Sequence, residues 1–167
     1  MKQMYDTLLK ILREEIDLYG MVLKLARDEK DALMRSDLDA LRTATDGKSS
    51  LVPTIQDMER KRQAVIEDVS EAVGRPSQEL NLREISRFAE EPFAARLKAC
   101  RSHLLSLASS ISEVGSQNRE FITHRLKLVR SSFSFLSHLT ASNTIYHNSG
   151  KMMMRSDRSG RVLSSQY

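Results

Sequence analysis

The residues of this chain that could carry out chemistry are few and scattered. Its four histidines are never three or four residues apart, the spacing that places two metal ligands on one face of a helix. They are His103, His124, His138 and His147. The single cysteine, Cys100, can form neither a thiolate cluster nor an internal disulfide. We therefore expect neither a metal site nor a bound cofactor.

The acidic pairs do not suggest catalysis either. Glu14–Glu15 and Glu90–Glu91 are adjacent in sequence, so on a helix their side chains point about 100° apart and cannot share a proton. We interpret both pairs as solvent-exposed. The glycines are too dispersed to form a phosphate-binding loop, and Cys100 falls in an apolar helical stripe, where it would be a small core residue. We expect that the protein is not an enzyme.

Composition favours one helical domain. The 167 residues are 40% hydrophobic and 29% charged, with only six glycines, three prolines and no tryptophan, too few turn residues for a β-sandwich or barrel. The N-terminus does not resemble a signal peptide, and no stretch reaches the roughly 18 apolar residues of a membrane span. We expect a cytoplasmic protein with no direct membrane insertion.

Charge is unevenly distributed. Residues 1–80 contain 13 Lys and Arg against 16 Asp and Glu, whereas residues 81–167 contain 13 against 6. A basic half can bind nucleic acid or an acidic protein partner. Its cations lack aromatic interleaving and a recognition motif, so we expect no nucleic-acid partner.

Apolar periodicity predicts two helices in the first half, over about 2–35 and 37–73. Ser36–Asp37 would end the first and start the second, and Gly74 would end the second. Gly47 and Pro53 predict a kink or a short break near residues 47–53. Two stripes give the first helix a wide apolar face: Leu9, Leu12, Ile16, Tyr19, Leu23, Ala26 and Leu33, and Leu8, Ile11, Leu18, Val22 and Leu25. The second buries Leu38, Leu41, Leu51, Ile55, Met58, Val65, Val69 and Ala72, with Ile66 and Val73 alongside.

A connector over 77–91, with a short helix near 82–89, leads to a long helix over about 92–141 that Pro92 opens. Its main stripe is Phe93, Leu97, Cys100, Leu104, Leu107, Ile111, Val114, Asn118, Phe121, Arg125, Leu128, Ser132, Phe135 and Leu139. A second stripe occurs only in the C-terminal half: Ile122, Leu126, Val129, Phe133 and Leu136. We predict an all-α antiparallel three-helix bundle or coiled coil over 1–142, with a flexible partner-binding tail over 143–167.

Two polar residues, Asn118 and Arg125, interrupt the main stripe. Each either sets the register of the bundle or contacts a partner. In the tail, Met152, Met153 and Met154 suit a surface that orders and adapts on binding. Further apolar residues flank them in sequence, namely Ile145, Tyr146, Val162 and Leu163.

The arrangement resembles the FlgN-type flagellar export chaperones. Lys48-Ser49-Ser50-Leu51 followed by Met58-Glu59-Arg60-Lys61-Arg62 resembles the family's K-x-x-L…L-E-x-x-R stretch. Asn118 before an apolar run, and Thr144-Ile145-Tyr146 with Gly150, resemble two further family segments. The resemblance covers nearly the whole chain.

The resemblance implies an export chaperone that binds flagellar hook–filament junction proteins, prevents their early assembly and delivers them to the flagellar type III export gate. Tyr146 would dock on the cytoplasmic domain of that gate. The residues expected to bind clients are Phe133, Leu136, Leu139, Ile145, Met152, Met153, Met154, Val162 and Leu163. The alternatives are a client-free coiled-coil or oligomerisation protein and, less favoured, a basic nucleic-acid-binding bundle. A weak homodimer through the long helix is compatible with the export hypothesis.

Overall fold

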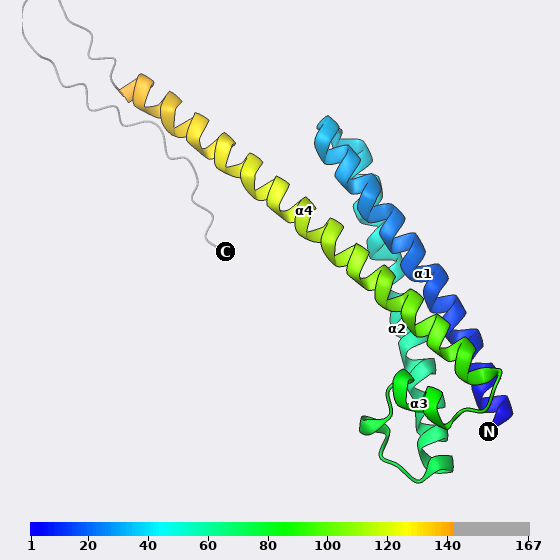
Figure 1. Ribbon diagram of the computed structural model, residues 1–167. Helices are drawn as coiled ribbons and strands as arrows, with labels where there is room; N and C mark the ends of the chain where they lie inside the picture. The colour runs from blue at the N-terminus through cyan, green and yellow to red at the C-terminus, as the bar shows by residue number, and fades with distance from the viewer. Residues whose placement is uncertain (142–167) are drawn as a thin grey trace, which may run out of the picture. The chain divides into compact units, whose positions relative to one another are not determined.

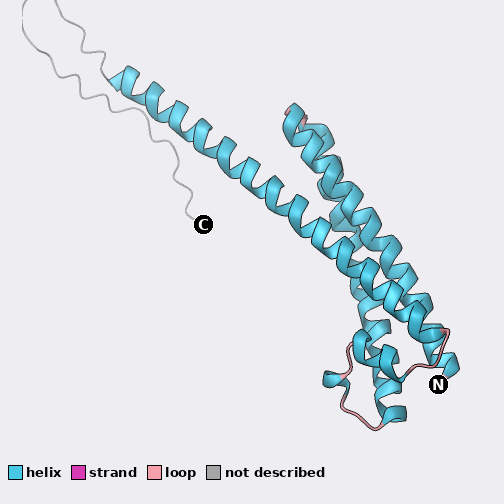
Figure 2. Cartoon of the chain, viewed as in Figure 1, coloured by secondary structure: helices cyan, strands magenta, loops and turns pink. Residues whose placement is uncertain are grey.

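A computed structural model describes residues 1–141, which are helical apart from short connections (Figures 1 and 2). The three long helices are α1 (Lys2–Arg35), α2 (Leu38–Val73) and α4 (Phe93–Ala141). Between α2 and α4 lie a 3₁₀ turn, η1 (Ser77–Glu79), and the short helix α3 (Leu82–Phe88). No strand occurs in residues 1–141. The predicted all-α class is confirmed, and α2 and α4 each begin one residue later than predicted.

The turn between α1 and α2 forms where the sequence predicts it. Ser36 adopts the left-handed conformation, with φ of 58°, and its N–H donates to the carbonyl of Leu33 at 3.3 Å. The N–H of Asp37 donates to the Ala32 carbonyl at 3.0 Å, which satisfies the last turn of α1. The Asp37 carboxylate then accepts the N–H of Ala40 at 3.0 Å and caps α2. The reversal is therefore encoded by two adjacent residues.

Similar local signals shape the connector. Gly74 ends α2 with φ of 70° and donates its N–H to the Ser70 carbonyl at 2.9 Å. The Asn81 side chain accepts the N–H groups of Arg83 and Glu84 at 3.0 and 3.1 Å, so it caps α3. The Gly74 and Asn81 caps fix where α2 ends and where α3 begins. The short helix α3 packs against the ends of the long helices (Figure 1).

The predicted break in α2 is wrong, because the helix is continuous from Leu38 to Val73. Pro53 is exposed, so water can satisfy the carbonyl that lacks its usual N–H donor. Gly47 has a packing role instead of a breaking one. A Cβ at Gly47 would lie 3.0 Å from a methyl group of Leu25, so the glycine allows α1 and α2 to approach closely.

The main core lies where the start of α1, the end of α2, α3 and the start of α4 meet. Its largest fully buried side chains are Leu8, Leu9, Leu12, Val69, Ile85 and Leu97. The rings of Tyr5 and Phe93 pack at a centroid distance of 5.7 Å. Full burial of one leucine contributes about 1.5–3 kcal/mol, so this cluster is the main source of stability among the described residues.

Most predicted apolar faces are covered. Both stripes of α1 are buried or half-buried, and so is every position of the α4 stripe from Phe93 to Phe121. Cys100 is half-buried against the core, as predicted. In α2, Leu38 and Ala72 are exposed, so those two predictions are wrong. Leu38 belongs to the first turn and Ala72 to the last, where the helix has fewer neighbours.

Internal contacts divide the chain into two units, Met1–Thr123 and His124–Tyr167, and α4 continues from the first into the second. The predicted division into a bundle domain, 1–142, and a tail, 143–167, stays a prediction, since residues 142–167 lie outside the described part of the chain.

Candidate functional site

Within the first unit, charged side chains meet in the interior at two points. At the first, the Arg62 Nε donates to a Glu15 carboxylate oxygen at 2.9 Å. The Glu15 side chain is only 8% exposed and that of Arg62 is 28% exposed. The interpretation of Glu15 as solvent-exposed is therefore wrong. Glu15 lies one turn after Ile11 and one turn before Leu18, on the face of α1 that packs against α2.

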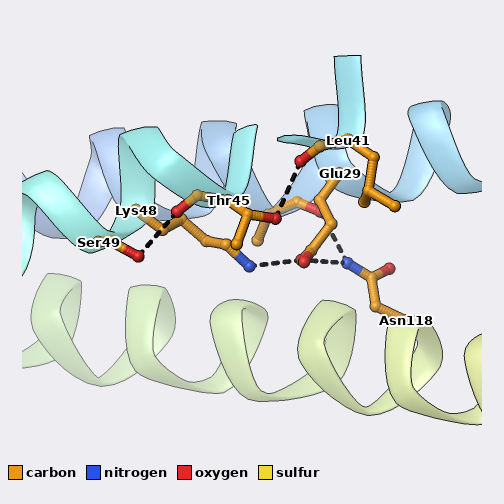
Figure 3. Close-up of polar contacts among 7 residues, drawn as sticks. Glu29, Leu41, Thr45, Lys48, Ser49 and Asn118 are labelled. Atoms are coloured by element: carbon orange, nitrogen blue, oxygen red, sulfur yellow. Dashed lines mark hydrogen bonds and ion pairs between the residues drawn. The ribbon is translucent and has the colours of Figure 1, made fainter. Parts of the chain in front are cut away.

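At the second point, three helices share one polar cluster, which Figure 3 shows. A Glu29 carboxylate oxygen accepts from the Lys48 ammonium at 2.6 Å and from the Asn118 amide at 2.9 Å. The same Asn118 nitrogen donates to the Ala26 carbonyl at 3.0 Å. Asn118 is 3% exposed. Its polar group thus joins α4 to α1 and, through Glu29, to α2, which favours the register-setting role over a partner contact.

The two ion pairs share one register. Glu15 and Glu29 are fourteen residues apart on α1, and Lys48 and Arg62 are fourteen apart on α2. Fourteen residues are two heptads, so both pairs occupy equivalent positions along one helix–helix seam. Their order shows that α1 and α2 run antiparallel. A shift of α2 by one turn would break both pairs together and leave two carboxylates in the interior, which makes that shift costly.

Burial raises the pKa of Glu15 above its usual value, since the folded chain removes water from the carboxylate. The nearby Arg62 acts in the opposite direction and lowers the pKa, without offsetting the burial completely. Without Arg62, ionisation of the Glu15 carboxyl group would cost more free energy. The pair supplies specificity of register more than net stability.

In the second unit, α4 carries a large exposed apolar surface. The exposed fractions are 51% for Leu126, 57% for Leu128, 51% for Val129, 69% for Phe133, 64% for Phe135 and 55% for Leu136. Apolar surface of this extent is typical of an interaction site. Two of the predicted client-binding residues, Phe133 and Leu136, belong to this surface. Leu139 falls in the last turn of α4, and its side chain lies outside the described part.

The other predicted contact residues lie outside the described residues altogether. They are Ile145, Tyr146, Met152, Met153, Met154, Val162 and Leu163. Among residues 1–138, His103, His124 and His138 are exposed, and no group of metal-ligating side chains is present. None of the helices in the described range is both long and apolar enough to span a membrane.

A family profile described as FlgN protein matches residues 1–153 of the chain. The chain belongs to the FlgN family. Membership supports a general role as a flagellar export chaperone. Neither the curated proteins nor the solved structures contain a match to this FlgN protein.

The fold also explains three of the residues that carry the resemblance to FlgN proteins. Lys48, Arg62 and Asn118 all take part in the interior polar contacts of the first unit. Sequence reasoning singled them out only as motif positions and missed their acidic partners, Glu15 and Glu29. The available signal was the equal fourteen-residue spacing of two acids on α1 and two bases on α2.

Proposed function

We propose that this FlgN protein is a cytoplasmic export chaperone that binds flagellar hook–filament junction proteins, prevents their premature assembly and delivers them to the flagellar type III export gate. The observation that carries the proposal is the family match over residues 1–153. The exposed apolar surface of α4 supports it, because a chaperone for unassembled helices needs apolar surface that a client can cover.

We assign client binding to the end of α4 and the tail. Phe133, Leu136 and Leu139 would form the helical part of the surface. The tail residues Ile145, Met152, Met153, Met154, Val162 and Leu163 would complete it. Methionine adapts to differently shaped partners. A segment that becomes ordered on binding loses conformational entropy, and this loss reduces the net free energy of binding. Affinity stays moderate, which suits a client that must later be released.

The test is co-purification of a hook–filament junction protein with the full chain, with a 1–142 truncation and with Phe133→Asp. Both altered forms should retain little client. The matched control is Leu105→Asp, since Leu105 is 54% exposed on the same helix but lies in the first unit. Equal capture by the truncation, or equal loss in the control, would contradict the assignment.

Gate docking is assigned to Tyr146 alone. Tyr146→Ala should keep the client bound and weaken binding to the purified cytoplasmic domain of the export gate. Tyr167→Ala is a matched control in the same tail, and it should leave gate binding unchanged. Unaltered gate affinity for Tyr146→Ala would remove the assignment.

A further inference from the structure

The exposed end of α4 has a heptad pattern of its own. Leu126, Val129, Phe133 and Leu136 are spaced by three, four and three residues, and each is more than half exposed. We call these four residues the outer seam. The spacing makes Leu126 and Phe133 a positions and Val129 and Leu136 d positions of a heptad, the pattern that packs against one further helix.

The ionised residues that flank the outer seam are all positively charged. In the same heptad register Arg125 occupies a g position and Arg130 an e position, the two positions that face the partner's charged residues in a coiled coil. Both side chains are exposed. The sequence from Phe121 to Ala141 contains Arg125, Lys127 and Arg130 and no Asp or Glu. The seam therefore has an arginine on each side, and beyond Arg125 the exposed c positions Leu128 and Phe135 extend the apolar surface.

This pattern disfavours a second copy of the chain as the occupant. In a parallel pair, a g residue faces the e residue five positions further along its partner, so Arg125 would face Arg130 of the other copy. In an antiparallel pair, g faces g and e faces e; when the four seam residues overlap fully, Arg130 faces Arg130 of the other copy, whereas Arg125 faces position 139. Either orientation places like charges opposite each other, and no carboxylate in this stretch offsets them.

We propose that the outer seam binds an amphipathic helix whose apolar a and d residues are flanked by Asp or Glu at its e and g positions. The inference rests on the proposed function for the biological source of that helix, a flagellar client. It adds the charge pattern by which this chain distinguishes such a helix from other apolar helices and from itself. Arginine suits the task, because its guanidinium forms bidentate contacts with carboxylates.

The test uses two synthetic amphipathic peptides with the same a and d residues, one with Glu and one with Lys at e and g. Binding to the full-length chain is followed by fluorescence anisotropy at low salt. The Glu peptide should bind on the order of tenfold more tightly than the Lys peptide, and the preference should shrink as salt is raised. The double change Arg125→Glu and Arg130→Glu should reverse the preference.

The control is Lys127→Glu, which reverses one charge at a b position, away from the outer seam, and is matched to each of the single changes Arg125→Glu and Arg130→Glu. It should preserve the preference for the Glu peptide. Circular dichroism should show that all variants keep their helicity, since the altered residues are exposed. Equal binding of both peptides, equal loss in the Lys127→Glu control, or displacement of the Glu peptide by random duplex DNA would each overturn the proposal.

These outcomes separate the inference from the proposed function. If the peptide preference holds but no junction protein co-purifies, the charge-selective seam stands and the client assignment fails. If a junction protein binds and its affinity is unchanged by the double arginine change, the chaperone role stands and the charge selection fails.

Discussion

The prediction that most directly probes the architecture concerns Arg62→Met. The substitution keeps an unbranched side chain that can pack along α2, and it removes the cation 2.9 Å from the Glu15 carboxylate. Glu15 is 8% exposed at its side chain, so little water can replace the lost partner. The variant leaves a buried carboxylate without its counter-ion.

Removing one partner of a fully buried ion pair costs about 3–5 kcal/mol. Arg62 retains 28% side-chain exposure, so some solvent already reaches the pair, and we expect a loss of about 2–3 kcal/mol in the free energy of unfolding at neutral pH. The double change Glu15→Leu and Arg62→Met should recover most of this loss, because it also removes the buried charge.

The pH dependence has a definite sign. The folded pKa of Glu15 already lies above the usual value of 4.5, and the loss of Arg62 raises it further. A carboxyl group with a raised folded pKa binds more protons in the folded chain, so stability falls as pH rises from the unfolded pKa through the folded pKa. The stability difference between wild type and Arg62→Met should therefore be small near pH 4 and largest at neutral pH.

The assay is urea unfolding followed by circular dichroism between pH 4 and pH 7, with NMR titration of the Glu15 carboxyl carbon. Arg60→Met is the matched control, because Arg60 is 78% exposed and pairs with Asp57 only at the surface. The control should unfold at nearly the same urea concentration as wild type, since exposed ion pairs contribute little to stability. A pH-independent difference for Arg62→Met, or an unchanged Glu15 titration, would refute the reasoning.

Further predictions concern Pro53, Asn118 and Arg125. Pro53→Ala should raise the free energy of unfolding by about 1–3 kcal/mol, measured in urea, since an exposed proline interrupts the hydrogen bonds of α2; a decrease would show that the proline is needed for packing. Asn118→Leu should lower the free energy of unfolding by about 1–3 kcal/mol, because the Ala26 carbonyl and the Glu29 carboxylate lose a hydrogen-bond donor that leucine cannot replace. Loss of more than about 3 kcal/mol would indicate that the cluster is a main source of stability. Arg125→Glu alone should increase self-association in sedimentation experiments, since the introduced carboxylate of one copy would face Arg130 of another in a parallel pair; an unchanged monomer fraction would contradict the heptad register.

Much of the fold follows from local signals in the sequence. The α4 stripe from Phe93 to Phe121 is covered at every predicted position, because a single helical period decides which side faces the bundle. Ser36, Asp37 and Gly74 end or start helices as predicted, since each acts through its own backbone conformation or side chain.

The errors come from effects that depend on tertiary packing. Pro53 does not break α2, because contacts with α1 on both sides of it keep the helix continuous. Glu15 is buried because Arg62, 47 residues further along, supplies its counter-charge. A single-sequence pattern shows that Glu15 lies among apolar positions, but only the pairing of α1 with α2 identifies its partner.

The residues of the candidate site also divide into those that the sequence pattern predicts and those that only the structure identifies. Phe133 and Leu136 could be predicted as exposed, because a second apolar stripe on one helix exceeds what two neighbours can cover. Arg125 and Arg130 can be assigned to the g and e positions only after the exposed residues have defined a heptad register. The tail residues rest on composition and on the resemblance to FlgN proteins.

The central proposal is that this FlgN protein binds a flagellar hook–filament junction protein, and we expect the contact to involve that protein's terminal helical regions. The most direct measurement is isothermal titration of the full-length chain with a purified hook–filament junction protein and with the same protein lacking its terminal helical regions. We predict saturable binding of the intact protein and none of the shortened form. Heat from neither form would contradict the proposal, and equal heat from both would contradict the involvement of the terminal helical regions.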